Sequence, residues 1–362
     1  MSPPLRDLLR LGAYQLLYLD RIPAHAAVST SVDLAREIAG KSPAGFVNAV
    51  LRRLDREAPP GPLVESGDPI ATLARTHSHP EWLVAGWVAR FGADGTEALL
   101  RWNNGRPPLI LQAAREDLTA LRERFDTAGV RSEAAPFGAG LVVDTARPAD
   151  LPGYAEGAFF VQDAAQALVA RFADFPRGGA VLDACAAPGG KAIALGRTSR
   201  LLVAAERNRR RSARLGQNLA RAGSGREYLV IADAAAPPVR PVDGVLLDAP
   251  CLGTGTFARH PDARLRVTPE ALRELARTQA LLLDGVAPAV RPGGLLVYAT
   301  CSLEPEENEE QVARFLAEHP DFHREPSRTV QPECLSPAGD LTLLPHRHGT
   351  DGAFAARLRR AP

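Results

Sequence analysis

The sequence predicts an α/β protein whose mostly parallel sheet, with helices on both faces, follows a helical N-terminal part and a small α/β subdomain. From about residue 153 onward, apolar runs of strand length alternate with helical stretches. Residues 1–57 instead carry apolar side chains at helical spacing. At 362 residues the chain is long enough for two or three domains. We therefore expect three parts, with boundaries at 1–60, 70–152 and 153–362.

The first 57 residues predict three helices. In the first, Gly12 lies on the apolar face and lets a neighbouring helix come close. The second is expected over Ala24–Ile38, and the third begins with Ser42 as its N-cap. This third helix should turn the following side chains inward: Phe46, Val47, Val50, Leu51 and Leu54. The proline- and glycine-rich stretch over Ala58–Pro69 is interpreted as a linker.

Composition excludes several classes of protein. Hydrophobic residues make up 45% of the chain, and no apolar run approaches the roughly 20 residues of a membrane span. The N-terminus lacks the pattern of a signal peptide. The four cysteines lie far apart without a CxxC pair, so we expect no disulfide framework, no metal site and a cytoplasmic protein. A net charge of +1 does not by itself indicate a nucleic-acid partner.

Acidic and small residues end the first predicted strands of the large domain. The first strand ends at Asp183 and leads into a loop of small residues, Ala186-Ala187-Pro188-Gly189-Gly190, that fits neither the dinucleotide nor the P-loop pattern. The second strand ends at Glu206, where a carboxylate can accept hydrogen bonds from ribose hydroxyls. The third ends at Asp233, which can accept from a base amino group. Together they favour a nucleoside cofactor without a pyrophosphate, and S-adenosylmethionine is the candidate.

Two cysteines follow the ends of two later strands. Cys251 comes after Asp248 in LLDAPC, and Cys301 follows the apolar run LLVYAT. Each can be a small core residue, but ligands bind at this edge of such sheets, so we expect both thiols to face the same site. Cys185 is expected to pack beside the small-residue loop. The residues alone do not rank Cys251 and Cys301.

Several motifs together resemble the S-adenosylmethionine-dependent RNA 5-methylcytosine methyltransferases. The resemblance rests on DACAAPGGKA, LLDAPCLGTGT, RHPD and YATCSLEPEENEE, and it runs from about Ala155 to the C-terminus. It implies a Rossmann-like class I methyltransferase sheet. LRLGAYQLLYLDRIPAHAAV with GFVNAVLRRL looks like the second half of a NusB-like helical domain, which marks the branch that methylates a cytosine of 16S ribosomal RNA.

The resemblance assigns roles to individual residues. Cys301 is the nucleophile that attacks C6 of cytosine, and Cys251 assists product release. Asp248 holds N3 and N4 of the base, and Lys191 favours the thiolate. The cofactor is expected to contact Cys185, Ala186, Ala187, Pro188, Gly189, Gly190, Lys191, Glu206, Asp233 and Asp248. The partner is RNA, without a membrane, and we expect a monomer. Candidates for phosphate contact are Arg207, Arg209, Arg210, Arg211, Arg259 and Arg264.

Three positions depart from the family pattern. Leu252 stands where serine is usual, Ala192 where threonine is usual, and Glu206 where aspartate is usual. Three alternatives stay open. A DNA cytosine-5 methyltransferase would use the cysteine of its PC motif as nucleophile. A non-catalytic NusB-like protein would bind RNA without a cofactor. A related 5-methylcytosine methyltransferase would act on tRNA or 23S ribosomal RNA.

Overall fold

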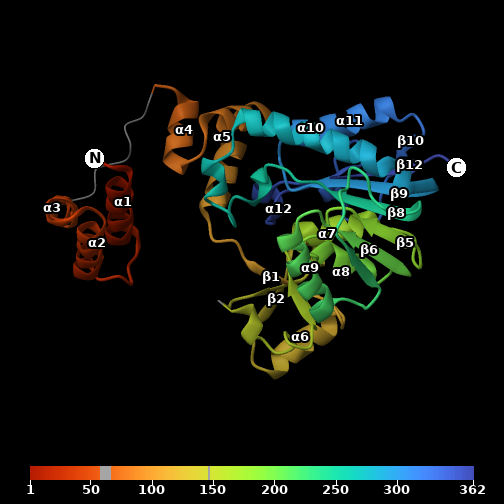
Figure 1. Cartoon of the computed structure of the whole chain (residues 1–362), viewed down its shortest axis with the longest axis horizontal. Helices are drawn as coiled ribbons and strands as arrows, with labels where there is room; N and C mark the ends of the chain where they lie inside the picture. Colours follow the sequence, from red (N-terminus) through yellow and green to blue (C-terminus); the bar gives the residue numbers. More distant parts are fainter. Residues whose placement is uncertain (58–66, 146) are drawn as a thin grey trace. The chain divides into compact units, whose positions relative to one another are not determined.

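The computed structural model describes residues 1–57, 67–145 and 147–362 (Figure 1). The chain forms two compact units, Met1–Pro69 and Ile70–Pro362. The predicted linker over Ala58–Pro69 falls largely outside the described residues.

The first unit holds three helices among its described residues: α1 (Pro3–Tyr18), α2 (Ala24–Ala39) and α3 (Lys41–Arg56). Leu8, Val47 and Leu51 lie in its core. A Cβ atom at Gly12 would lie 2.6 Å from Leu51 Cδ1 and 2.9 Å from Ser31 Oγ, so this glycine does let the helices come close, as predicted.

Two predictions for the third helix are wrong. The helix begins at Lys41 with Gly40 at the N-cap position, where a φ of 90° suits glycine, so Ser42 lies inside the first turn. Phe46 is 52% exposed rather than inward. The buried stripe of this helix runs through Ala44, Val47 and Leu51, and Phe46 lies off that stripe because successive helical residues are about 100° apart.

The second unit is built on an eight-stranded sheet of described residues with the strand order β10-β12-β9-β8-β5-β6-β7, and β11 also pairs with β12. The five adjacent strands β9-β8-β5-β6-β7 are parallel, while β12 is antiparallel to β9. The strands are β5 (Ala180–Asp183), β6 (Leu201–Ala205), β7 (Glu227–Val230), β8 (Val242–Asp248), β9 (Val290–Thr300), β10 (Phe322–Arg324), β11 (Leu341–Leu343) and β12 (Ala353–Arg360). The predicted mostly parallel sheet is confirmed.

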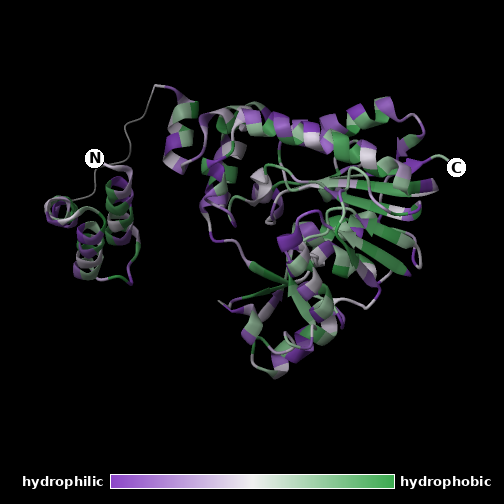
Figure 2. Ribbon diagram, viewed as in Figure 1, coloured by the Kyte–Doolittle hydropathy of each residue, from purple (hydrophilic) through white to green (hydrophobic). Residues whose placement is uncertain are grey.

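Helices cover both faces of this sheet (Figure 1). One face packs on α7 (Ala164–Ala173), α8 (Gly190–Gly196) and α9 (Arg209–Ala222), and the other on α10 (Pro269–Val286) and α11 (Glu309–Glu318). Successive residues of β8 divide between the two cores, with Leu246 in one and Leu247 in the other. Hydrophobic residues therefore fill the central strands, as Figure 2 shows.

A second, four-stranded sheet of described residues has the order β2-β3-β1-β4 and is antiparallel throughout. Its elements are β1 (Leu109–Ala113), α6 (Leu118–Thr127), β2 (Ser132–Ala134), β3 (Leu141–Val143) and β4 (Phe159–Val161). Phe159 of β4 packs against Phe125 of α6. Because β4 pairs with β1, this sheet extends past residue 152, where we placed the start of the large domain.

Two further helices, α4 (Pro69–His77) and α5 (Glu81–Asn104), precede the small sheet, and α12 (Pro345–His348) lies against α5. Of the large apolar side chains of α5, Leu83 and Trp87 are buried and Trp82 and Phe91 half-buried. Their cluster includes Phe257 and Leu303, from the segments that follow β8 and β9. In the described part of the chain, no helix combines the length and apolar character needed to cross a membrane.

Candidate active site

The chemically distinctive residues of the large domain lie at one edge of its sheet. Asp183 ends β5 and Asp248 ends β8, the neighbouring strand. Glu206 directly follows β6, and Cys301 directly follows β9. The chain order reverses between β5 and β8, and parallel sheets bind ligands at such a reversal, beyond the carboxyl ends of the strands.

Lys191 joins the first-strand loop to the end of β8. Its Nζ atom lies 2.7 Å from Asp248 Oδ2, and it also donates to Gln166 Oε1. The Lys191 side chain is 9% exposed and that of Asp248 28%, so this ion pair is largely shielded from water. No sequence pattern indicated that Gln166 would contact the lysine.

Asp183 is a buried carboxylate without a matched partner. It is 1% exposed, and neither of its Oδ atoms makes a well-formed hydrogen bond with the described residues. Burial, and then the nearby charge of Asp248, raise its pKa to about 7. Such a group would be stabilised by a cationic ligand. Sequence reasoning gave it no role, although an acid ending a fully apolar strand was the available signal.

The second strand ends in a buried acid and the third is followed by an exposed one. Glu206 is 5% exposed, and its Oε1 atom accepts a hydrogen bond of 2.8 Å from the Asn208 N–H. Asp233 keeps 43% of its side chain exposed and accepts a bond from the Ala235 N–H, which lowers its pKa. Both acids keep oxygen lone pairs that a ligand can use.

The small-residue loop is held by α9. Arg211 Nη2 donates to the Ala187 carbonyl and Asn218 Nδ2 to the Pro188 carbonyl, each at 2.8 Å. Gly189 has a φ of 113°, and a Cβ there would lie 2.9 Å from Leu215 Cδ1. The missing side chain therefore also serves the packing of the loop against α9.

The two cysteines of the site are in contact. Cys251 Sγ and Cys301 Sγ lie 3.3 Å apart, and the Cys301 N–H donates to Cys251 Sγ at 3.4 Å. The hydrogen bond to Cys301 is the main cause, with burial second, that raises the pKa of Cys251 well above its usual value. A pKa raised in this way favours the protonated form of the Cys251 thiol, and the contact places this thiol beside Cys301 Sγ.

The loop that carries Cys251 is fixed by groups that the sequence did not reveal. The Glu307 carboxylate accepts the Leu252 N–H at 3.0 Å and a bond of 2.8 Å from Gln279 Nε2. The Gly255 N–H donates to the Cys301 carbonyl at 3.0 Å. Leu252 is thus held through its backbone, which explains how the chain tolerates leucine where the family usually has serine.

The segment after Cys301 is ordered by Asn308. Asn308 Nδ2 donates to the Ser302 carbonyl at 2.9 Å. The following helix, α11, begins at Glu309 with acids in its first turn, which suits the helix dipole. Leu303 N–H donates to Thr254 Oγ1 at 2.8 Å, so this segment and the Cys251 loop hold each other.

Arg259 is not a free phosphate ligand, and its assignment to phosphate contact is wrong. Its Nη2 atom lies 2.7 Å from Asp163 Oδ2, and its Nε atom 2.7 Å from Asp351 Oδ2. The side chain is 24% exposed, and both acids are buried. The guanidinium instead ties the RHPD segment to the start of α7 and to the residues before β12.

The remaining cysteines are not activated. Burial raises the pKa of Cys185 to about 12 and that of Cys334 to about 11. Cys185 packs against the core on the α10 side of the sheet, as expected. No group of three or more His, Cys, Asp or Glu side chains that could hold a metal ion occurs among the residues with described positions.

Three family models match the chain. A model described as 16S rRNA methyltransferase RsmB/F matches residues 174–359. A NusB family model matches residues 1–56, and a model described as the ferredoxin-like domain of RsmF/B-like methyltransferases matches residues 79–150.

Curated relatives match over nearly the whole chain. The probable ribosomal RNA small subunit methyltransferase B of Synechocystis is 36% identical, and the match covers 99% of this chain and 84% of the relative. Ribosomal RNA small subunit methyltransferase B of Pseudomonas syringae is 37% identical, with coverages of 97% and 80%.

Solved structures share the fold. The crystal structure of PH0851 superposes with a TM-score of 0.86 at 27% identity and covers 99% of this chain and 83% of its own. NSun6 from Pyrococcus horikoshii, solved with SFG, gives 0.69 at 19% identity, with coverages of 78% and 98%. The predicted Rossmann-like fold is confirmed, and the matches over the full chain show that it belongs to the 16S rRNA methyltransferase RsmB/F family.

Proposed function

We propose that this protein transfers a methyl group from S-adenosylmethionine to C5 of a cytosine in 16S ribosomal RNA through a covalent bond between Cys301 and C6 of the base. The observation that carries the proposal is the contact of the Cys251 and Cys301 sulfurs, 3.3 Å apart, at the sheet edge that also holds the Lys191–Asp248 pair. The curated relatives from Synechocystis and Pseudomonas syringae carry names that refer to the small-subunit ribosomal RNA.

The residues at the strand ends fit the cofactor. Asp183 offers a buried carboxylate to the ammonium group, and Glu206 and Asp233 offer carboxylates to the ribose and the base amino group. The backbone from Cys185 to Gly190, with Lys191 and Asp248 beside it, would border the cofactor. When bound, S-adenosylmethionine supplies an electrophilic methyl group next to the base.

Cys301 supplies the nucleophile. C5 of cytosine is unreactive while the ring is aromatic, and a bond from the Cys301 sulfur to C6 moves electron density onto C5. A free thiol is only a few per cent ionised at neutral pH, so the site has to favour the thiolate. The Cys251 thiol does so by donating to Cys301 Sγ, because charge-assisted hydrogen bonds are the stronger ones.

Asp248 and Lys191 hold the base. The Asp248 carboxylate can accept a hydrogen bond from the N4 amino group and share a proton at N3, where negative charge develops once C6 is attacked. Lys191 fixes this carboxylate through the 2.7 Å contact between Nζ and Oδ2. The pair thereby orients the cytosine edge relative to the Cys301 sulfur.

Cys251 takes part in product release. After the methyl group is on C5, the proton of C5 has to leave before the sulfur–C6 bond breaks and the ring regains aromaticity. The Cys251 sulfur lies beside Cys301 and, once its own proton has passed to solvent, can accept the C5 proton while the electrons of the sulfur–C6 bond return to the Cys301 sulfur. The target base has to be unpaired or flipped out, at a cost of roughly a few kcal/mol, since C6 is covered within a stacked helix.

Bisulfite sequencing of ribosomal RNA tests the proposal. Cells that lack the gene should lose the 5-methylcytosine signal at one position of 16S RNA, and the wild-type gene should restore it while Cys301→Ala should not. A lost signal in tRNA or 23S RNA would instead assign the enzyme to that RNA. Activity that survives Cys301→Ala but not Cys251→Ala would support the DNA-type arrangement of the nucleophile. Failure to bind S-adenosylmethionine in calorimetry would support a non-catalytic RNA-binding protein.

We also expect the enzyme to act as a cytoplasmic monomer. The proposed catalytic and cofactor residues all come from Ile70–Pro362 of one chain, so no second copy is needed to complete the site. Size-exclusion chromatography with light scattering should give the mass of a single chain. Cell fractionation should recover the protein with the ribosomal subunits and the soluble cytoplasm.

A further inference from the structure

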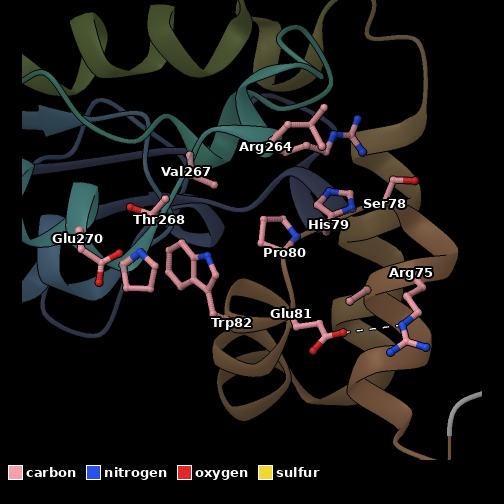
Figure 3. Close-up of a pocket in the computed structure, with 13 residues that line it drawn as sticks. Arg75, Ser78, His79, Pro80, Glu81, Trp82, Arg264, Val267, Thr268 and Glu270 are labelled. Carbon is pink, nitrogen blue, oxygen red and sulfur yellow. Dashed lines mark ion pairs between the residues drawn. The ribbon is translucent and has the colours of Figure 1, made fainter. Parts of the chain in front are cut away.

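A pocket of ≈ 620 Å³ lies on the second unit, away from the strand ends. Its walls are the junction of α4 and α5, with His79, Pro80 and Trp82, and the segment from Arg264 to the start of α10 (Figure 3). This volume is within the range of small-ligand pockets, about 300–1,000 Å³. No residue of the pocket takes part in the mechanism above.

One side of the pocket presents an aromatic surface. Trp82 is half-buried, and in Figure 3 its indole points toward the segment that carries Thr268. Leu265, another lining residue, is 79% exposed. An indole face and exposed apolar atoms suit a planar ring such as a nucleobase.

The other side holds a buried cation without a counter-ion. Arg264 is 6% exposed and donates to the carbonyls of Pro261 and Asn103, at 3.0 and 3.2 Å, and to the side chain of Asn104. It also donates to the His77 carbonyl at 3.4 Å, and burial alone, with no contribution from a carboxylate among the described residues, lowers the pKa of the Arg264 guanidinium. The neighbouring His79 is kept neutral, because burial and then Arg264 lower its pKa to about 4. An anionic group would compensate the Arg264 charge.

The acids that line the pocket have cationic partners of their own. Glu81 lies 3.8 Å from Arg75, and Glu270 lies 2.6 Å from Arg273. Their charges are thus largely balanced at the rim, and the Arg264 charge is left for a ligand. A nucleotide, with a flat base and a phosphate, combines the two features that the pocket offers.

The walls of the pocket pack against the segments that follow both cysteines. Arg264 follows the Cys251 loop along the chain, and Phe257 between them contacts the His79 ring, with centroids 6.1 Å apart. On the α5 side, Trp87 Nε1 donates to Glu304 Oε1 at 3.1 Å, three residues after Cys301. A nucleotide bound here would therefore rest on a wall that packs against the segments following both cysteines.

We propose that this pocket binds an unpaired nucleotide of the RNA substrate that flanks the target cytosine, with its base on Trp82 and its phosphate facing Arg264. This inference rests on the proposed function. Extruding one base from a stack also exposes its neighbours, and stacking on an aromatic side chain replaces the contacts that are lost. The pocket would thus contribute to the choice of RNA as well as to its affinity.

The test combines base removal in the RNA with substitution of Trp82 in the full-length protein. The probe is a synthetic RNA hairpin around the cytosine mapped by bisulfite sequencing, with abasic residues placed one at a time at the flanking positions. One abasic position should raise KM roughly tenfold with little change in kcat, as expected for a lost stack. Trp82→Ala should raise KM for the intact hairpin by a similar factor, and removing that base should then raise KM no further. For Trp82→Phe, which keeps an aromatic ring, KM should still rise when that base is removed.

Two controls separate this inference from the proposed function. Leu281→Ala, an exposed leucine of α10 outside the pocket, should leave KM unchanged. Wild-type protein that methylates no RNA would reject the proposed function itself. Methylation with the same KM in the wild type, in Trp82→Ala and on every abasic hairpin would reject the pocket alone.

Photo-crosslinking with wild-type protein covers the case in which Trp82→Ala folds poorly. A 5-bromouridine at the flanking position identified by the abasic series should crosslink to the peptides that contain Trp82 or Thr268. Crosslinks confined to peptides outside the pocket would overturn the assignment.

Discussion

Cys251 Sγ lies 3.3 Å from Cys301 Sγ, although the two residues are 50 positions apart in the sequence. The contact exists because each cysteine follows one of two adjacent parallel strands, β8 and β9. Hydrogen bonding to Cys301 and burial raise the pKa of Cys251, and the proposed mechanism gives the two sulfurs different roles.

Substituting the two cysteines should therefore have different effects. Cys301→Ala should reduce methylation by on the order of a thousandfold or more, because no nucleophile remains. In the Cys251→Ala variant, Cys301 should still attack C6, but the methylated product should be released slowly. A protein–RNA adduct should therefore accumulate and be visible on denaturing gels. Cys334→Ala, a buried cysteine of the core, is the matched control and should keep normal turnover. An adduct that accumulates in Cys301→Ala instead would reverse the assignment.

Removing the charge of Lys191 should cost stability as well as activity. Lys191→Met leaves the carboxylates of Asp183 and Asp248 close together without the ammonium group, and loss of one partner of a shielded pair costs about 3 kcal/mol. Urea denaturation should show this loss. Lys41→Met, at the exposed start of α3, should show none.

Asp248→Asn should mainly lower the rate of methyl transfer. The amide cannot take the role of the carboxylate at N3 and N4, so the methylation rate should fall about 10²- to 10⁴-fold. Binding of S-adenosylmethionine, measured by calorimetry, should change by much less. A rate close to that of the wild type would remove Asp248 from the mechanism.

The buried Asp183 should make the stability depend on pH. Its pKa rises from 3.8 to about 7 on folding, so between these values the folded protein holds a proton that the unfolded chain has lost. The free energy of unfolding should therefore fall as pH rises through this range, by at most about 4 kcal/mol at about 1.4 kcal/mol per pKa unit.

Asp183→Asn should remove that part of the pH dependence when urea denaturation is compared at pH 5 and pH 8. Asp243→Asn is the control. A hydrogen bond from the Ala180 N–H lowers the pKa of Asp243, so its effect on stability should be the same at both pH values. Equal slopes in the wild type and Asp183→Asn would show that Asp183 is ionised in both states.

Gly255 tests the contact between the two cysteine loops. A Cβ at this position would lie 2.6 Å from Gly352 Cα and 2.8 Å from the Cys301 carbonyl oxygen, both backbone atoms. Gly255→Ala should lower the free energy of unfolding by about 1–3 kcal/mol and displace the Cys251 loop, with a large loss of turnover. Gly86→Ala in α5, where no atom lies within 4 Å, should instead stabilise the protein by about 0.5–1 kcal/mol.

The sequence predicted the sheet and the edge at which its chemistry lies. Apolar runs that end at Asp183, Glu206, Asp248 and Cys301 are local signals, and the geometry of parallel strands brings such ends together without further information. The small-residue loop and Lys191 were recognised for the same reason, because they follow the first strand directly along the chain.

The tertiary structure alone decided which groups pair. Arg259 was predicted to contact phosphate, but in the folded protein it pairs with Asp163, 96 residues away in the sequence. The contact of Cys251 with Cys301 and the burial of Asp183 beside Asp248 join separate strands and loops. Strand periodicity and capping act between neighbours in the sequence, whereas desolvation and charge pairing depend on distances in space, which the fold alone determines.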